Sequence, residues 1–271
     1  RNEVLELAEE NKTAKDMFDL DGKQYFGYGS GSHAFVEGAP LYSRYGKAYA
    51  GVTEKGESMW YMWDIKYLKD ANDNLVLDKD GNPQEVSRSL TTTTNFSAAN
   101  NFVMESSMPE WYGGFGTSIE FYGVDFTANF SYQLGGKVYD GDYAAAMSSP
   151  TAGSTGQAYH KDLWNAWTPE NPNSDIPRFQ FGDQYTAGSS DRFYVSSNYL
   201  SLNNLTLGYT FPRKWMSKIG IQRLRIYVAC ENVWYWSERD GLDPRQSITG
   251  GASQAYYSPV RTISGGLNLT F

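Results

Sequence analysis

Apolar and polar residues alternate along several stretches of this chain of 271 residues, and the clearest stretch is the last one. Between Arg261 and Phe271, the apolar side chains of Ile263, Leu267 and Leu269 alternate with small polar ones. Alternate side chains of a β-strand point to opposite faces, so this stretch predicts a strand with one apolar and one polar face. Such a strand, here ending on an aromatic residue, is typical of a transmembrane barrel, where lipid covers the outer face and water or a plug the inner one.

The same alternation predicts more strands upstream. Residues 113–121 and 124–134 form a predicted hairpin around a tight turn at Tyr122-Gly123. A change of parity at Asn203-Asn204 predicts a β-bulge within the next strand. The remaining predicted strands cover residues 2–8, 24–36, 41–52, 59–68, 200–211 and 224–231.

Short and long connections alternate between these predicted strands. The short ones are 53–57, 122–123 and 212–220, and the long ones are 69–111, 135–190 and about 236–257. Transmembrane barrels have short periplasmic turns and long extracellular loops, whereas a soluble sheet has no reason to keep this order. We therefore predict an all-β fold, an antiparallel transmembrane barrel segment of about nine strands. Because single-chain bacterial barrels close with an even number of strands, we expect the segment to belong to a larger barrel.

Composition narrows the choice of class. A net charge of −8 argues against a nucleic-acid-binding protein, which needs a basic face. The single cysteine, Cys230, cannot form an internal disulfide, and no run of 18 apolar residues predicts a membrane helix. A mean hydropathy of −0.55 still fits a barrel because its inner face and loops are polar. The chain opens on Arg1 rather than on an initiator methionine, and we expect a fragment of a longer polypeptide.

Several short motifs resemble those of one family of outer-membrane proteins. In chain order they include Trp111-Tyr-Gly-Gly-Phe-Gly-Thr, Tyr132-Gln-Leu-Gly-Gly-Lys-Val-Tyr-Asp140, Trp167-Thr-Pro-Glu-Asn-Pro-Asn173, Leu202-Asn-Asn-Leu-Thr-Leu-Gly-Tyr-Thr-Phe-Pro212, Gly241-Leu-Asp-Pro244 and Gly265-Gly-Leu-Asn-Leu-Thr-Phe271. Together they resemble the SusC/RagA-type TonB-dependent outer-membrane transporters. The resemblance covers essentially the whole chain, residues 1–271, in the order of the family.

This resemblance implies a barrel of about 22 strands filled by an N-terminal plug, of which the chain matches only the C-terminal part of the barrel. It implies import of large nutrients across the outer membrane of a Gram-negative cell, mainly oligosaccharides and in some members peptides. The expected partners are a SusD-like lipoprotein lid, the rest of the barrel with its plug, and membrane lipid. TonB would act through the plug and not through this chain. We expect no cofactor, no nucleic-acid partner and no enzymatic activity.

Three groups of residues are candidates for function. By resemblance, Leu267, Leu269 and Phe271 form the signal that the barrel-assembly machinery reads, although a plain lipid-facing strand would look the same. Aromatic rings of the long loops offer flat apolar area to a sugar face, or pack within the loops or against the lid. These rings belong to Trp164, Trp167, Tyr185, Tyr235, Tyr256 and Tyr257. Arg223, Arg225 and Glu231 are predicted to face the lumen, where buried charges need partners in the wall or plug.

Other sequence features are explained by ordinary structural roles. Residues 70–74 and 78–82 resemble pieces of calcium loops but lack a closing glutamate, and they match ordinary turn chemistry. His33 and His160 have no metal-ligand spacing. Trp234 and Trp236 are expected at the outer membrane interface and Trp215 at the inner one.

Two other classes remain as alternatives. A soluble, secreted, glycan-binding β-sandwich would bring the apolar strand faces together in one core. An outer-membrane hydrolase would need a Ser–His or carboxylate constellation on lumen-facing positions, and the two histidines lie in weakly patterned stretches.

Overall fold

The computed structural model describes residues 2–8, 13–79, 81–152, 157–183, 186, 188, 190–246, 251–252 and 259–271. Strands predominate, helices are few and short, and the chain forms two compact units. Residues 107–139 and 195–271 form the first, called here the long-strand unit, and residues 2–106 and 140–194 form the second, called the mixed unit. No helix within the described ranges is both long and apolar enough to cross a membrane.

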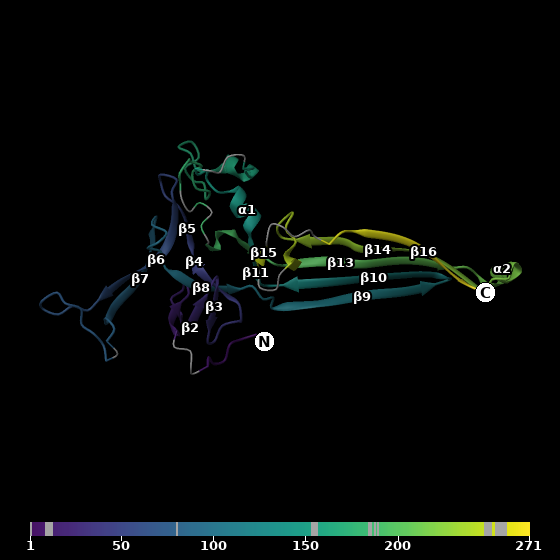
Figure 1. The fold of residues 1–271 in the computed structure, drawn as a ribbon, viewed down its shortest axis with the longest axis horizontal. Coiled ribbons are helices and arrows are strands. Elements are labelled where there is room, and N and C mark those ends of the chain that lie inside the picture. The colour runs from purple at the N-terminus through teal and green to yellow at the C-terminus, as the bar shows by residue number, and fades with distance from the viewer. Residues whose placement is uncertain are drawn as a thin grey trace. The chain divides into compact units, whose positions relative to one another are not determined.

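Five antiparallel strands make up the main sheet of the long-strand unit, in the order β16-β14-β13-β10-β9 (Figure 1). Their bounds are Trp111–Phe121 (β9), Val124–Leu134 (β10), Tyr199–Thr210 (β13), Arg223–Ser237 (β14) and Thr262–Thr270 (β16). Strands that follow one another in the sequence are neighbours in the sheet, so the sheet is a meander. The fold class and the hairpin predicted from the alternation are confirmed. The expected count of about nine barrel strands stays a prediction.

The predicted β-bulge is confirmed and extends over two strands. The register between β10 and β13 shifts at Asn203, and the register between β13 and β14 shifts beside it, where Asn232 has a φ of 50°. One extra residue reverses the faces of all the residues beyond it. The two shifts therefore place Leu202 opposite Trp234 and Leu205 opposite Cys230, so apolar residues remain on one face along the whole strand.

The connections at one end of this sheet are short. Tyr122 and Gly123 have φ values of 49° and 86°, which is the backbone of a two-residue hairpin turn. The connection from β13 to β14 consists of α2 (Arg213–Met216) and the 3-10 turn η3 (Ser217–Ile219). At the other end lie β11 (Lys137–Asp140), β12 (Tyr194–Ser196), β15 (Gly251–Ala252) and η4 (Pro244–Gln246).

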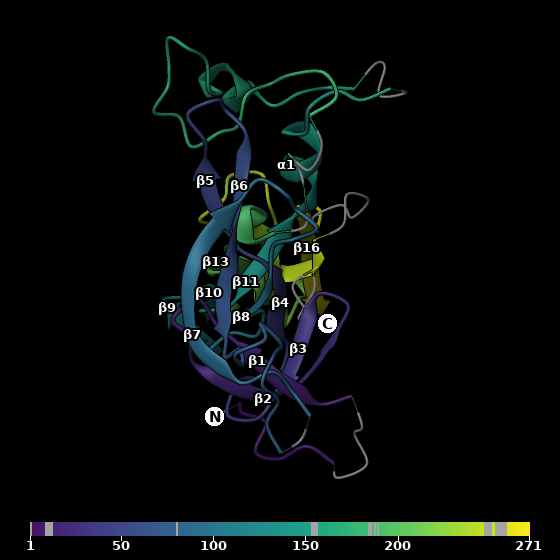
Figure 2. The same ribbon diagram turned by 90° about the vertical axis from the view of Figure 1, so that its left-hand side faces the viewer.

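The mixed unit contains two sheets and three short helical elements (Figure 2). One sheet has the order β1-β2-β3-β4-β8, with Lys15–Phe18 (β1), Gln24–Ser30 (β2), His33–Val36 (β3), Ser43–Lys47 (β4) and Asn101–Ser106 (β8). Its core contains Met17, Ala34, Val36, Ala39 and Val103. The other sheet contains Tyr49–Val52 (β5), Ser58–Tyr67 (β6) and Glu85–Thr93 (β7). The helical elements are α1 (Gly141–Ala146), η1 (Lys161–Asn165) and η2 (Asp191–Phe193).

Several predictions for the mixed unit are wrong. Residues 2–8 form no strand, and the single strand predicted for 24–36 is a hairpin that turns at Gly31, where φ is 59°. The strand predicted for 41–52 is two strands in different sheets, and the polar stretch 69–111 contains β7 and β8. Most residues of β7 are exposed on both faces, so this strand carries no alternation by which its sequence could reveal it.

The alternation of short and long connections also fails at residues 53–57. This turn packs against the long segment 140–194, because the Arg178 amide N–H donates to the Gly56 carbonyl at 2.8 Å and Arg178 Nη1 donates to the Lys55 carbonyl at 3.1 Å. The Trp167 ring lies against Gly56, where an added Cβ would stand 2.5 Å from it. Most of residues 140–194 belong to a predicted long extracellular loop. A turn on the periplasmic side of the membrane could not contact them, so residues 53–57 do not form a periplasmic turn.

Candidate membrane-facing sheet and ligand pocket

The apolar side chains of the five long strands share one face, and that face is open. Across β14 and β16, Leu224 pairs with Leu269 and Ile226 with Leu267. The exposed fraction is 53% for Leu207 and 70% for Ile263. A contiguous apolar surface of this kind marks contact with another apolar phase, and alternation along every strand is the pattern of a membrane barrel.

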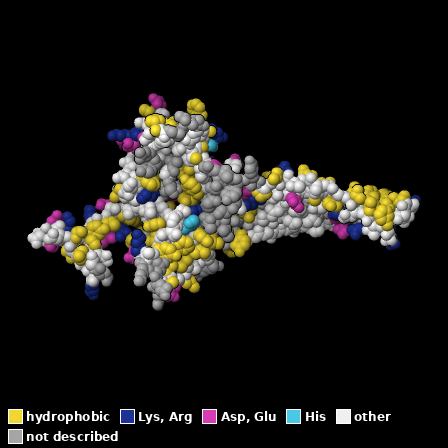
Figure 3. All heavy atoms as spheres, in the orientation of Figure 1, with side chains coloured by type: hydrophobic (Ala, Val, Ile, Leu, Met, Phe, Trp, Pro, Cys, Tyr) yellow, Lys and Arg dark blue, Asp and Glu magenta, His cyan; other side chains and the backbone are white. Residues whose placement is uncertain are grey.

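Aromatic residues lie at both ends of this apolar face. Trp234 and Trp236 are half exposed where β14 approaches the long loops. Trp215 on α2 and Phe271 are exposed at the opposite end, where yellow side chains gather around α2 in Figure 3. Amphipathic rings at two levels with aliphatic side chains between them match the aromatic girdles of a barrel.

The opposite face is polar and is crossed by an ion pair. Asp125 on β10 and Arg225 on β14 meet across β13, where Arg225 Nε donates to Asp125 Oδ1 at 2.8 Å and Arg225 Nη2 donates to Oδ2. They pass over Gly208, where an added Cβ would stand 2.5 Å from both partners. The Arg225 guanidinium also lies 4.9 Å from the centre of the Tyr227 ring. A face with paired charges belongs to a wet or plugged interior rather than to lipid.

A second cluster of polar side chains lies on this face, near the long loops. Arg245 is held by the carboxylate of Asp243, which is buried, and its Nη1 donates to Ser201 Oγ at 3.0 Å. The guanidinium lies 4.8 Å from the centre of the Tyr235 ring. Next to it, Asn203 Nδ2 donates to Ser131 Oγ at 2.9 Å. The segment after β14 thus folds back over its own sheet.

The three candidate lumen residues share the polar face. Arg223 lies opposite Thr270, Arg225 opposite Asn268 and Glu231 opposite Thr262. Arg225 is paired with Asp125, which is the structural role expected for a buried charge. Arg223 and Glu231 are exposed. Whether this face lines the lumen of a closed barrel stays a prediction.

The other candidate residues differ in their exposure and in their packing. Leu267, Leu269 and Phe271 are exposed at the edge of the sheet, and their role as an assembly signal stays a prediction. Trp164 on η1 is 91% exposed, whereas the Trp167 ring packs on Gly56 and the Tyr235 ring packs under Arg245. Tyr185, Tyr256 and Tyr257 lie outside the described residues. Of the three described aromatic candidates, therefore, Trp164 alone presents an open ring.

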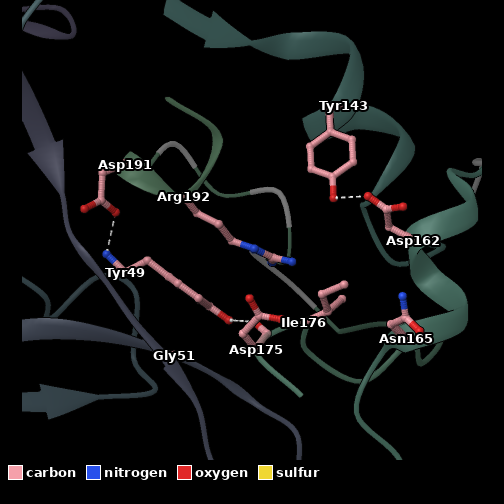
Figure 4. Close-up of a pocket in the computed structure, with 9 residues that line it drawn as sticks. All are labelled: Tyr49, Gly51, Tyr143, Asp162, Asn165, Asp175, Ile176, Asp191 and Arg192. Carbon is pink, nitrogen blue, oxygen red and sulfur yellow. Dashed lines mark hydrogen bonds between the residues drawn. The ribbon is translucent and has the colours of Figure 1, made fainter. Parts of the chain in front are cut away.

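The mixed unit contains an open pocket of about 790 Å³ (Figure 4). Five separate segments line it, with the residues Tyr49, Gly51, Tyr143, Asp162, Asn165, Asp175, Ile176, Asp191 and Arg192. Pockets of this size hold small molecules or short stretches of a polymer.

Hydrogen bonds fix two walls of this pocket. The Tyr49 N–H donates to Asp191 Oδ1 at 2.7 Å, and the Tyr49 hydroxyl donates to the Asp175 carbonyl at 3.1 Å. The Tyr143 hydroxyl donates to Asp162 Oδ2 at 2.8 Å. The two bonds of Tyr49 join segments that are more than a hundred residues apart, so the pocket forms only when the loops have folded together.

Burial sets the electrostatics of the pocket. Burial lowers the pKa of Arg192 and raises the pKa of Asp191, because each charged form loses water. The Arg192 guanidinium lies 5.1 Å from the centre of the Tyr49 ring and 5.0 Å from that of Phe193. Arg192 Nη1 donates to the Thr186 carbonyl at 3.0 Å.

This pocket was not predicted from the sequence. Arg192, Tyr49 and Tyr143 were not candidates, because they lie on separate elements and form no motif along the chain. The only available signal was the length of segment 135–190, since long loops in compact folds usually carry function.

The remaining sequence features have structural roles. The Asp70 carboxylate accepts from the N–H groups of Asn72 and Asn74 at 2.8 and 2.9 Å, and Asp78 accepts from Asn82 at 2.9 Å, which is turn chemistry. His160 Nδ1 accepts from the Asp162 N–H at 3.2 Å and so caps η1. Within the described ranges, no three His, Cys, Asp or Glu side chains gather as a metal site would require.

The fold and its open apolar face thus define a segment of a membrane β-barrel. No protein-family model matches the chain. Among curated proteins, TonB-dependent receptor P3 of Formosa agariphila is 27% identical over 245 residues, which is 87% of this chain and 22% of the relative. TonB-dependent receptor P39 of the same organism is 26% identical over 302 residues, which is 100% of this chain and 27% of the relative.

Solved structures of transporters have a similar fold. The RagAB peptide transporter matches with a TM-score of 0.70 and 23% identity, over 92% of this chain and 25% of the solved chain. The RagAB peptide importer in its open-open state matches with a TM-score of 0.66 and 22% identity, over 94% of this chain and 25% of the solved chain. The resemblance to SusC/RagA-type TonB-dependent transporters is therefore confirmed, and the chain spans only about a quarter of the length of these proteins.

Proposed function

We propose that this chain is the C-terminal part of the barrel of a TonB-dependent importer, which carries large nutrients across the outer membrane of a Gram-negative cell. The observation that carries the proposal is the five-stranded meander with an open apolar face and a polar, ion-paired opposite face. In a barrel, the first face would meet lipid and the second would face the plug or the solute. The relatives named TonB-dependent receptors support the same function.

In this proposal the chain supplies barrel wall and extracellular loops. Leu267, Leu269 and Phe271 act as the assembly signal, and Arg223, Arg225 and Glu231 face the lumen. A SusD-like lipoprotein covers the loops, and TonB pulls on the plug, which belongs to another part of the protein. The match to RagAB, a complex of two components by its name, supports such a partner. The chain itself catalyses no reaction.

Two substrate classes follow from different observations. Oligosaccharides are the first candidate, because the fully open ring of Trp164 offers a stacking surface to a sugar. Peptides are the second candidate, favoured by the peptide transporter and importer structures that the chain resembles. A glycan-binding sandwich is disfavoured, because it would bury the apolar strand faces against each other, and Leu207 and Ile263 are exposed.

Uptake by cells tests this function. The full-length protein that carries this chain would be produced with its lipoprotein partner in a Gram-negative host and offered a fluorescent maltoheptaose or a fluorescent octapeptide. We expect one of these two probes to accumulate in the periplasm, and accumulation to stop when the host lacks TonB. The control is the same host without the transporter. Accumulation of neither probe, or accumulation that persists without TonB, would contradict the proposal.

A further inference from the structure

A second, smaller pocket of about 320 Å³ lies in the long-strand unit, at an open strand edge. β14 pairs with β16 only as far as Glu231 and then continues to Ser237. In the described part of the chain, this last stretch of β14 pairs with β13 on one side and with no strand on the other. The residues that line the pocket are Asn232, Trp234, Tyr235, Arg245, Pro259 and Arg261.

The charged residues of this pocket are both cationic. Among the described lining residues, Arg245 and Arg261 carry charge and no carboxylate is present. Asp243 neutralises Arg245, because its carboxylate oxygens accept from Arg245 Nε at 2.8 Å and from Nη2 at 2.6 Å. Arg261 forms no ion pair with any described residue. The sequence from residue 244 to the last residue contains no Asp or Glu, so one positive charge in the pocket stays without a counter-ion from this segment.

Arg261 belongs to the apolar side of the sheet. Asn232 Nδ2 donates to the Val260 carbonyl at 3.2 Å, which holds the chain beside β14 just before β16 begins. Arg261 precedes Ile263 by two residues, and alternate residues of an extended chain point the same way. Ile263 is part of the exposed apolar face, whereas Glu231 is part of the polar face. The guanidinium is therefore on the side that would meet lipid.

The pocket lies at the level of the aromatic girdle. Trp234 lines it, and both Trp234 and Trp236 are half exposed at the long-loop end of β14. Tryptophan rings at such a level sit among lipid headgroups. Toward the middle of the sheet, Val228 and Ile263 are exposed and provide aliphatic surface. A cation at this level, with an apolar surface next to it, matches both parts of a lipid that carries a phosphate.

We infer that this pocket binds the phosphate group of a membrane lipid, with Arg261 on the phosphate and the acyl chains along Val228 and Ile263. The donors of a guanidinium match two oxygens of a phosphate. A free phosphate ion finds the same donors but leaves the apolar surface uncovered. The inference rests on the lipid-facing sheet of the proposed function, and it goes beyond import because it assigns a lipid ligand.

Calorimetric titration of the full-length protein in detergent tests this inference. The probes are dihexanoyl phosphatidic acid, dihexanoylglycerol, which lacks the phosphate, and inorganic phosphate, which lacks the chains. We expect the phosphatidic acid to bind, and each of the other two probes to bind about tenfold more weakly or worse, since each loses one of the two kinds of contact. This comparison uses the unaltered protein, so it does not depend on whether any variant folds.

Variants then locate the effect. Arg261→Gln is expected to bind the phosphatidic acid no better than dihexanoylglycerol, and Arg261→Lys to keep part of the preference because it keeps the charge without the planar fork. The matched control exchanges two neighbours, Arg261→Thr together with Thr262→Arg. It keeps the composition and net charge but moves the guanidinium to the polar face, where Glu231 lies opposite position 262. The exchange should weaken lipid binding as much as Arg261→Gln does.

Four results would overturn the inference: no binding of the phosphatidic acid, equal binding of dihexanoylglycerol, equal binding of inorganic phosphate, or full lipid binding by the exchanged variant. Failure here is distinguishable from failure of the proposed function. TonB-dependent uptake with no role for Arg261 in lipid binding would remove this site and leave the importer, whereas Arg261-dependent lipid binding without uptake would do the reverse.

Discussion

Replacing Leu207 with arginine is expected to destabilise the inserted barrel by roughly 2–4 kcal/mol, the cost of a cation near the bilayer midplane on the lipid side. Leu207 lies on β13 between Phe126 and Val228, within the open apolar face, and is 53% exposed. In lipid, a guanidinium at this position has neither water nor a counter-ion. The measurement is the midpoint of urea unfolding of the full-length protein in vesicles, together with its amount in the outer membrane.

The neighbouring residue provides a matched control. Thr206 precedes Leu207 on the same strand, lies opposite Thr127 and Ala229, and points to the polar face. Arginine at position 206 adds the same bulk and charge where water or polar groups can reach it, so the loss should be much smaller. Equal losses for Leu207→Arg and Thr206→Arg would mean that the apolar face does not meet lipid.

Replacing Phe271 with alanine is expected to lower the amount of assembled protein in the outer membrane several-fold. Phe271 follows Leu267 and Leu269 at intervals of two residues, and it is exposed at the short-turn end of the sheet. An aromatic ring at this level anchors a barrel strand at the membrane interface. In the proposed assembly signal, the same ring is what the insertion machinery contacts. Quantitative immunoblots of outer membranes, with and without heating to unfold barrels, measure the effect.

Tyrosine at position 271 is the control, because it keeps the ring and should keep near-normal levels. If Phe271→Ala assembles as well as the unaltered protein, the signal does not depend on this ring. If alanine and tyrosine both reduce assembly equally, shape rather than aromatic character is read at this position.

The long-strand unit could be predicted from the sequence because each strand has different environments on its two faces. Lipid on one side and polar groups on the other impose a period of two, which is visible in residues 124–134 and 262–270. The bulge at Asn203 was visible for the same reason, since it interrupts that period. The ion pair between Asp125 and Arg225 was not, because it joins residues a hundred positions apart and depends on the space above Gly208.

The mixed unit could not be predicted in this way. Its strands are short, and β7 is exposed on both faces while β3 alternates only between buried and half-buried, so their sequences carry little period. Its arrangement depends on contacts between distant loops, such as Arg178 with Gly56 and Tyr49 with Asp191. The pocket around Arg192 follows from those contacts. For that reason the aromatic candidates chosen by residue type included Trp167, whose ring is occupied in packing.

A spin-label scan along β14 tests whether the apolar face of the long-strand unit meets lipid. Single cysteines would be placed at positions 224–229 of the full-length protein in lipid vesicles, on a Cys230→Ser background. We expect oxygen dissolved in lipid to reach labels at Leu224, Ile226 and Val228, and a water-soluble nickel chelate to reach labels at Arg225, Tyr227 and Ala229. Equal access to both reagents along the strand, or the opposite alternation, would contradict a membrane-facing sheet.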